Sequence, residues 1–138
     1  MVEKKTLAII PARGGSKRIP KKNIIDFQGK PMIAWTIEAA LESEVFSKVI
    51  VSTDDELISN VSKKYGASVP FLRKKNVDDH STVSDVIVNV LEELEENYDH
   101  VVMLMANCPL RNSEDIKNAV RCFNSPSNHW FSLKINNV

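Results

Sequence analysis

Short apolar runs alternate with longer amphipathic stretches from one end of this chain to the other. The apolar runs have the length of strands and fall at residues 7–10, 48–53, 68–71, 100–105 and 129–135. Between them, apolar residues recur at helical spacing in residues 31–43, 54–66, 83–94 and 113–123. Strands joined by single helices favour right-handed crossovers between parallel strands. The order βαβαβαβαβ therefore predicts a three-layer α/β/α fold with a mainly parallel, Rossmann-like sheet.

The helical spacing also predicts which side chains face the core. Ser113 is expected to cap the last of these helices, and Thr82 with Asp85 resembles a capping box before the third. Gly66 is the expected C-terminal stop for the second helix. The residues expected to point inward are Ile33, Ile37, Ala40, Leu41, Leu57, Ile58, Val61, Tyr65, Val83, Val86, Ile87, Val90, Leu91, Leu94, Ile116, Ala119, Val120 and Phe123.

Composition narrows the class of protein. With 138 residues, of which 43% are hydrophobic and 26% charged, residues 1–138 fit one globular domain. Eighteen basic and 18 acidic residues balance, so no general attraction for nucleic acid or anionic membranes is expected. No apolar run approaches the roughly 20 residues that span a bilayer. Cys108 and Cys122 form no CxxC pair, which favours reduced thiols and a cytoplasmic location.

The loop after the first apolar run, "PARGGSKRIPKKN" at residues 11–23, is strongly basic. It holds five cations and no carboxylate. Gly14 and Gly15 let backbone N–H groups approach an anion, and Ser16 adds a hydroxyl donor. Arg13 can bind phosphate oxygens as a fork, whereas Lys17, Lys21 and Lys22 act as point charges. Ligands gather at the carboxyl ends of parallel strands, so this loop is typical of a polyphosphate site. The alternative is a solvated surface loop.

This loop is neither a Walker A motif nor a GxGxxG motif. As "IIPARGGSKRIPKKNI", residues 9–24, it closely resembles the opening motif of the acylneuraminate cytidylyltransferase family. These are the CMP-sialic acid synthetases and their relatives acting on other nine-carbon sugar acids. Further stretches resemble the family in the same order and extend the resemblance over essentially the whole chain: "GKPMIAWTIEAAL" (29–41), "VIVSTDDELI" (49–58), "VPFLRKK" (69–75), "STVSDVI" (81–87) and "CPLR" (108–111).

The resemblance implies a nucleotidyltransferase fold and a reaction between CTP and a free sugar acid. The anomeric hydroxyl would attack the α-phosphorus, and pyrophosphate would leave. Arg13, Lys17 and Lys22 match the catalytic cations, with Lys22 near the α-phosphate. The residues matching family positions that hold the nucleotide are Ala12, Gly14, Gly15 and Ser16 for the phosphates and Asn23, Arg73 and Thr82 for cytosine and ribose. Mg²⁺ is the expected cofactor.

Two departures from the family pattern bear on the acceptor and the metal. The family usually has QPTSPLR where this chain has "MANCPLR", so a glutamine that contacts the sugar acid becomes Met105. Asn107 and Arg111 are the other candidate substrate residues, and the acceptor is expected to be sialic, legionaminic or pseudaminic acid. The chain also ends at Val138, before the dimerisation lobe and the metal-binding aspartates of the family. We therefore expect a truncated nucleotide-binding part, no metal ligands within it, and a homodimer only in a longer form.

Several other interpretations stay open. Asp54 and Asp55 are expected to cap a helix, with metal ligation as the alternative. Cys108 is expected to be a packed thiol rather than a nucleophile. The three histidines lack metal-ligand spacing. The competing functions are a non-catalytic nucleotide-binding or assembly module, a nucleotidyltransferase for eight-carbon sugar acids, and an RNA-binding loop, against which the lack of interleaved aromatics argues.

Overall fold

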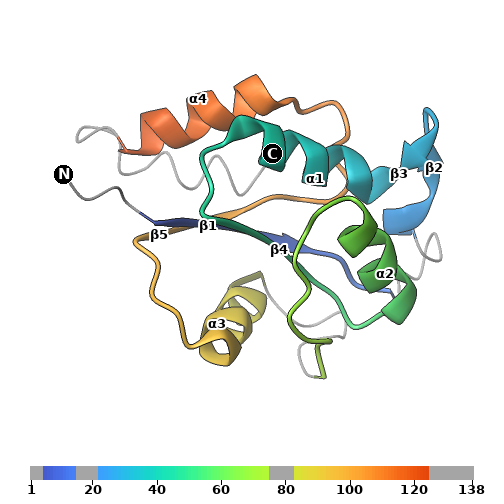
Figure 1. Cartoon of the computed structure of the whole chain (residues 1–138), viewed down its shortest axis with the longest axis horizontal. Helices are drawn as coiled ribbons and strands as arrows, with labels where there is room; N and C mark the ends of the chain where they lie inside the picture. The colour runs from blue at the N-terminus through green and yellow to red at the C-terminus, as the bar shows by residue number, and fades with distance from the viewer. Residues whose placement is uncertain (1–4, 15–21, 75–82, 125–138) are drawn as a thin grey trace.

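A parallel sheet with its first strand in the middle organises the structure. The computed structural model describes residues 5–14, 22–74 and 83–124. Strand β1 (Thr6–Pro11) lies between β4 (Lys48–Ser52) and β5 (His100–Met103), and both pairings are parallel (Figure 1). Ile9 aligns with Ile50 on one side and Met103 on the other. The sheet is covered on both faces, which explains why β1 is a continuous apolar run.

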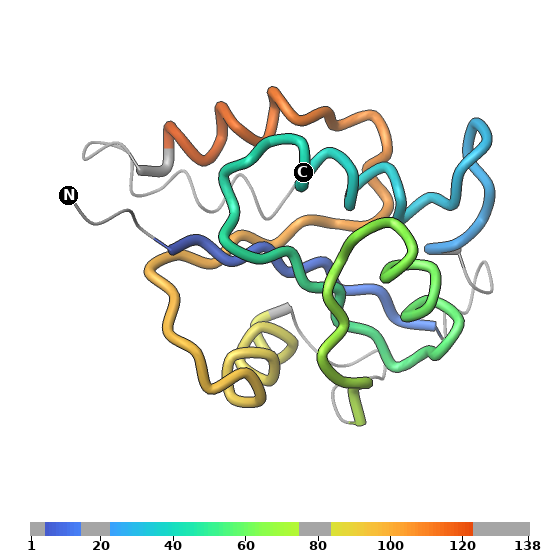
Figure 2. Tube along the Cα trace, viewed as in Figure 1, coloured from blue at the N-terminus to red at the C-terminus, as the bar shows by residue number. Residues whose placement is uncertain are grey.

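Helices cover both faces of this sheet and confirm the expected three layers. Helices α1 (Met32–Ser43), α2 (Glu56–Lys64) and α4 (Ser113–Asn124) pack with Ala8 and Ile10 on one face. Helix α3 (Val83–Leu94) packs with Leu7 and Ile9 on the other, where the trace shows it below the strands (Figure 2). No helix within the described ranges is long and apolar enough to cross a bilayer.

The strand predicted at residues 68–71 is not continuous. Only two isolated parallel bridges join this segment to β4 and its end, at Ser68 and at Leu72. Pro70, between them, has no N–H to donate to a ladder. The segment nevertheless follows β4, because the Val51 N–H donates to Ser68 O at 3.0 Å and the Arg73 N–H to Thr53 O at 2.8 Å. These two hydrogen bonds place Arg73 at the carboxyl edge of the sheet. The strand predicted at 129–135 lies outside the described residues.

Most of the predicted inward faces are confirmed. Leu41 and Leu57 are exceptions, with exposed fractions of 42% and 46%. Leu57 lies in the first turn of α2 next to Ile58, which takes the fully buried position instead. Thr82 and the side chains of Val83 and Phe123 lie outside the described residues. The confirmed buried or partly buried residues are Ile33, Ile37, Ala40, Ile58, Val61, Tyr65, Val86, Ile87, Val90, Leu91, Leu94, Ile116, Ala119 and Val120.

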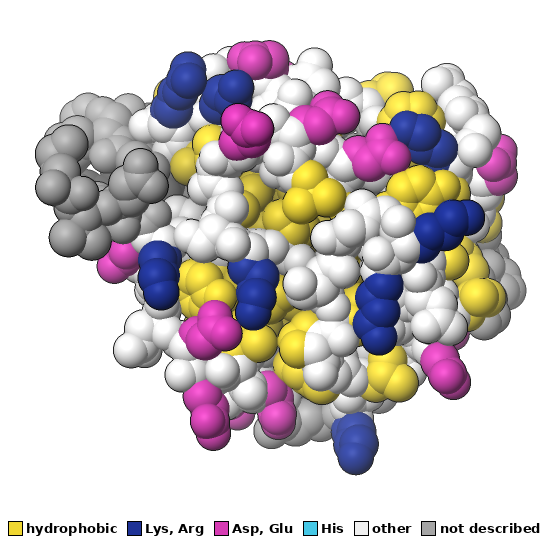
Figure 3. Space-filling view, in the orientation of Figure 1, with side chains coloured by type: hydrophobic (Ala, Val, Ile, Leu, Met, Phe, Trp, Pro, Cys, Tyr) yellow, Lys and Arg dark blue, Asp and Glu magenta, His cyan; other side chains and the backbone are white. Residues whose placement is uncertain are grey.

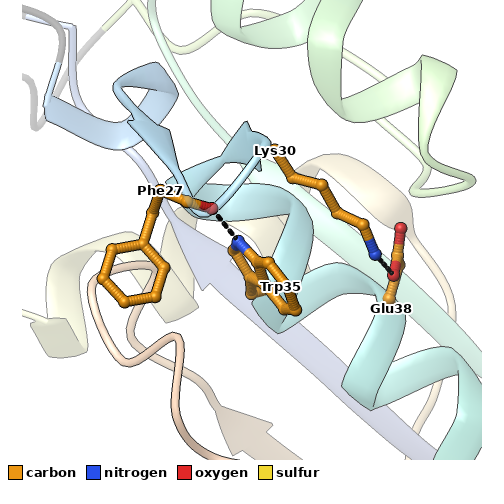
Figure 4. A network of polar contacts seen from close by, with 4 residues as sticks. All are labelled: Phe27, Lys30, Trp35 and Glu38. Atoms are coloured by element: carbon orange, nitrogen blue, oxygen red, sulfur yellow. Dashed lines mark hydrogen bonds and ion pairs between the residues drawn. The ribbon is translucent and has the colours of Figure 1, made fainter.

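Between the basic loop and α1, the chain forms a small hairpin that the sequence analysis did not predict. A 3-10 turn, η1 (Lys22–Ile24), leads into β2 (Asp26–Phe27) and β3 (Lys30–Pro31). Trp35 Nε1 donates to Phe27 O at 2.8 Å, and Lys30 Nζ lies 2.6 Å from Glu38 Oε2 and 4.5 Å from the Trp35 ring centre (Figure 4). These contacts attach the hairpin to α1 and so fix the far end of the basic loop.

The cap of α4 differs from the expectation. The helix begins at Ser113, and the side chain that accepts from its first turn is that of Asn112. Asn112 Oδ1 accepts from the Asp115 N–H at 2.8 Å, and Asp115 Oδ2 accepts from the Asn112 N–H at 3.2 Å. This reciprocal pair is a capping box, with an aspartate in place of the more frequent glutamate.

We expect Asn112→Ala to lower the free energy of unfolding by about 1 kcal/mol, the usual cost of losing an N-cap side chain. Ser113→Ala is the matched control, and its effect should stay within about 0.5 kcal/mol because Ser113 lies inside the helix. Urea unfolding followed by circular dichroism measures both variants. A larger loss of stability in Ser113→Ala than in Asn112→Ala would instead indicate Ser113 as the capping residue.

Candidate nucleotide-binding site

Three polar loops meet at the carboxyl edge of the sheet, as the strand order predicts. The chain crosses from β1 to β4 through α1 on one face, and reaches β5 through α3 on the other. Strand order therefore reverses between β1 and β5, which is where open parallel sheets form a ligand crevice. The loops that follow β1, β4 and β5 begin at Ala12, Thr53 and Leu104.

The start of the basic loop is held by hydrogen bonds on both sides of one peptide unit. The Asn23 side-chain Nδ2 donates to Arg13 O at 3.0 Å. The N–H of Gly14, in the same peptide unit, donates to Asp54 Oδ1 at 2.9 Å. Just before it, the Ala12 N–H donates to Ser52 O at 2.9 Å and extends the pairing of β1 with β4. The Arg13–Gly14 peptide therefore has a fixed orientation.

The two aspartates after β4 have different roles. Asp55 Oδ1 accepts from the Ile58 N–H at 3.0 Å, and Asp55 is the N-cap of α2, as expected. Asp54 precedes the cap and binds the basic loop instead. Within residues 5–14, 22–74 and 83–124, no three His, Cys, Asp or Glu side chains are grouped so as to hold a metal ion. The helix-capping interpretation is confirmed for Asp55 and is wrong for Asp54, which accepts from the Gly14 N–H instead.

The structure leaves no space for a side chain at Gly14. A Cβ at this position would lie 2.7 Å from both Cβ and Oδ2 of Asp55. The Cβ of a capping residue is attached directly to the backbone, so it cannot move aside as a flexible side-chain end can. The basic loop and the first turn of α2 are therefore packed against each other at Gly14.

Arg73 adds a buried cation to this edge. Its side chain is only 6% exposed. Burial lowers the pKa of the Arg73 guanidinium; the negative charge of Asp54 acts to raise that pKa, and the positive charge of Arg13 lowers it further. Arginine keeps its proton in proteins even so. The Arg73 and Arg13 guanidinium groups thus lie within each other's electrostatic field, with the Asp54 carboxylate acting on Arg73 as well.

The loop after β5 is closed by its own arginine. Arg111 Nη2 donates to Met105 O at 3.1 Å, and Thr36 Oγ1 on α1 donates to the same oxygen at 3.3 Å. Burial lowers the pKa of Arg111, and the neighbouring Cys108 and Asp115 partly offset that shift. Arg111 therefore shapes the loop from within. The sequence analysis missed Thr36, a buried hydroxyl whose partner lies 69 positions away.

The remaining candidates differ in how the structure places them. Ala12 is buried, Met105 is half-buried and Asn107 is exposed. Cys108 is a half-buried free thiol whose Sγ lies 3.9 Å from Asn107 Oδ1. Lys22 begins η1, but its side chain lies outside the described residues, as do Gly15, Ser16, Lys17 and Thr82. The structure thus brings Arg13, Gly14, Asn23 and Arg73 together around Asp54.

Charge elsewhere on the surface is mixed. Figure 3 shows Lys and Arg side chains interspersed with Asp and Glu side chains over one face, rather than gathered by sign. Nucleic-acid surfaces usually concentrate cations along one face or stripe. The described residues on this face therefore offer no support for the RNA-binding alternative.

Comparisons with known proteins find one family and several relatives over most of this chain. Residues 7–136 match the model of the cytidylyltransferase family. The pseudaminic acid cytidylyltransferase of Campylobacter jejuni serotype O:2 is 52% identical over 86% of this chain and 53% of its own length. The CMP-N,N'-diacetyllegionaminic acid synthase of Legionella pneumophila is 43% identical over 83% of this chain and 51% of its own length.

A solved structure shares the fold of this chain. The CMP:2-keto-3-deoxy-manno-octonic acid synthetase complexed with CTP superposes with a TM-score of 0.76 and 28% identity, over 89% of this chain and 48% of that one. The chain thus spans about half the length of the curated relatives and the solved structure that it matches.

Proposed function

Because this chain belongs to the cytidylyltransferase family, we propose that it binds CTP at the carboxyl edge of its sheet and forms the nucleotide-binding part of a CMP-sugar-acid synthetase. The observation that carries the proposal is the fixed Arg13–Gly14 peptide at the switch point, beside a second guanidinium at Arg73. A fixed backbone with cations beside it is the kind of arrangement that stabilises transferring phosphoryl groups.

In the proposed reaction, a bond forms between the anomeric oxygen of the sugar acid and the α-phosphorus of CTP. The bond from that phosphorus to the bridging oxygen breaks, pyrophosphate departs, and the hydroxyl proton passes to solvent. Arg13 and Lys17 would hold the β- and γ-phosphates together with Ser16 and the backbone of Gly15. Lys22 would offset charge at the α-phosphate. Such catalysis depends on positioning and on charge rather than on a covalent intermediate.

The nucleoside would lie between Asn23 and Arg73, with Thr82 as the third contact. Asn23 Nδ2 already donates to Arg13 O, so Asn23 would recognise the nucleoside through its Oδ1, which is an acceptor. A ribose hydroxyl or the amino group of cytosine can donate to it. Arg73 is a donor and suits the cytosine carbonyl. This assignment supports a preference for CTP over ATP.

We propose a nine-carbon sugar acid as the acceptor, because the pseudaminic and legionaminic acid enzymes are so similar in sequence. Met105, Asn107 and Arg111 would border it, with Arg111 fixing the loop through Met105 O. Mg²⁺ would accompany CTP and neutralise phosphate charge. A cytoplasmic location and a homodimer in a longer form complete the proposal.

Calorimetric titration of the chain with CTP, with and without Mg²⁺ and with ATP for comparison, tests this function. We expect CTP-selective binding, weakened on the order of 100-fold in an Arg13→Ala, Lys17→Ala double variant that loses two charge-assisted phosphate contacts. Lys63→Ala with Lys64→Ala is the matched control, since it removes two exposed cations at the far end of α2. Equal affinity for ATP, or an equal loss in both double variants, would contradict the proposal.

A second candidate function is nucleotide binding without turnover. Release of pyrophosphate from CTP in the presence of a sugar acid distinguishes the two. Binding without release identifies a nucleotide-binding module.

A further inference from the structure

We infer that Asp54 is a positioning residue for the basic loop: with Asn23 it fixes the orientation of the Arg13–Gly14 peptide, and so directs Arg13 toward the triphosphate. This inference rests on the proposed function and goes beyond it, since Asp54 itself would touch no substrate. Asp54 Oδ1 binds the peptide at its N–H, and Asn23 Nδ2 binds it at its oxygen, with separations of 2.9 and 3.0 Å.

A peptide held at one end alone can rotate about its neighbouring φ and ψ angles. Holding both its N–H and its C=O removes that freedom, since both bonds cannot persist if the peptide turns over. Both contacts come from later in the chain, but from different elements: Asn23 lies 10 positions from Arg13, and Asp54 lies 40 positions from Gly14. The loop is thereby tied both to η1 and to the carboxyl end of β4.

Asp54 also links the two parts of the proposed nucleotide site. Its charge acts on Arg73, the candidate for the nucleoside, while its oxygen holds Gly14 at the start of the phosphate loop. The turn that contains Asp54 is itself rigid, because Asp55 caps α2 and the Asp55 N–H donates to Thr53 Oγ1 at 3.1 Å. A movement of the loop would therefore have to break contacts with a fixed support.

Electrostatics and positioning predict opposite effects of removing this carboxylate. Coulomb's law alone predicts that a site without the Asp54 charge binds a polyanion more tightly. A positioning role predicts weaker binding, because the loop loses its orientation. The sign of the change in CTP affinity for Asp54→Ala therefore separates the two, and Asp54→Asn keeps an oxygen that can accept from the Gly14 N–H.

The experiment titrates wild type, Asp54→Ala and Asp54→Asn with CTP, each with and without Mg²⁺, and checks folding by circular dichroism. We expect CTP binding to weaken roughly 10- to 100-fold in Asp54→Ala, the size expected for losing a hydrogen bond to a charged group. Asp54→Asn should stay within about threefold of wild type, because the hydrogen bond survives. Unchanged or tighter binding by Asp54→Ala would overturn the inference. So would an equal loss in Asp54→Asn, which would indicate a role for the charge.

Asp99 supplies a matched control. Its Oδ2 accepts from the Lys5 backbone N–H at 2.8 Å, a bond of the same kind at the opposite, amino edge of the sheet. Asp99→Ala, which removes a more exposed bond, should lower stability no more than Asp54→Ala does and should leave CTP affinity unchanged. A loss of CTP affinity in Asp99→Ala equal to that in Asp54→Ala would overturn the inference, since both effects would then reflect general loosening.

A readout without nucleotide separates this inference from the proposed function. The sequence has four glycines, so labelling with ¹⁵N-glycine gives a simple spectrum. We expect the Gly14 amide proton to exchange slowly in wild type and in Asp54→Asn, and rapidly in Asp54→Ala. That pattern in a chain showing no preference for CTP would support the role of Asp54 while contradicting the function. A rapidly exchanging Gly14 in wild type would overturn the inference.

Discussion

Gly14→Ala is expected to weaken CTP binding on the order of 100-fold, equivalent to about 2.7 kcal/mol. The added methyl group would lie 2.7 Å from two atoms of Asp55, one of them a Cβ close to the backbone. The loop must therefore move away from α2, and the hydrogen bond from the Gly14 N–H to Asp54 is lost with it. Calorimetric titration with CTP measures the change.

Gly29→Ala is the matched control for this variant. Gly29 has a φ of 92°, and no neighbouring atom lies within 4 Å of an added Cβ. Glycine is therefore favoured there by the backbone conformation and not by a lack of space. Alanine there should cost about 1–2 kcal/mol of stability and leave CTP affinity unchanged. A Gly14→Ala variant that binds CTP as wild type does would show that the loop is not packed against α2 when nucleotide is bound.

The second large effect is on stability. Ile58→Ala should lower the free energy of unfolding by about 2–5 kcal/mol, because its side chain is fully buried and leaves a cavity. Leu57→Ala, one residue earlier in α2, should cost less than about 1 kcal/mol, since Leu57 is 46% exposed. Urea unfolding measures both losses, provided that the dependence of the unfolding free energy on urea concentration has the same slope in each variant. Equal losses of stability in the two variants would indicate that Leu57 faces the core, as the helical spacing predicted.

The sequence predicted the order of the elements well, because strong periodicity marks β1, β4, β5 and the four helices. It did not predict the hairpin of β2 and β3, whose strands have two residues each. No local pattern specifies such short strands. The hairpin instead depends on its contacts with Trp35 and Glu38 on α1. The discontinuous strand near Pro70 shows a second limit. Its apolar composition is typical of a strand, but Pro70 has no backbone N–H to donate to a neighbouring strand.

The candidate site was predictable where charge is concentrated and unpredictable where it depends on distant contacts. Five cations without a carboxylate indicated the basic loop directly. The contact between Asp54 and Gly14 spans 40 positions, and an aspartate after a strand is equally typical of a helix cap. The same holds for Thr36, to which the helical pattern assigned no role and whose partner Met105 O lies 69 positions away. Only the fold brings these groups to their partners.

The central position of β1 has a consequence for how the chain is made. Thr6 aligns with His100, so the second neighbour of the central strand is synthesised long after the first. Until residues 100–103 leave the ribosome, one side of β1 offers unpaired backbone groups flanked by apolar side chains, a surface prone to wrong pairing. Long-range parallel pairing of this kind also slows folding. A nascent chain that has completed β4 but not β5 is therefore the stage at which aggregation, or protection by a chaperone, is expected.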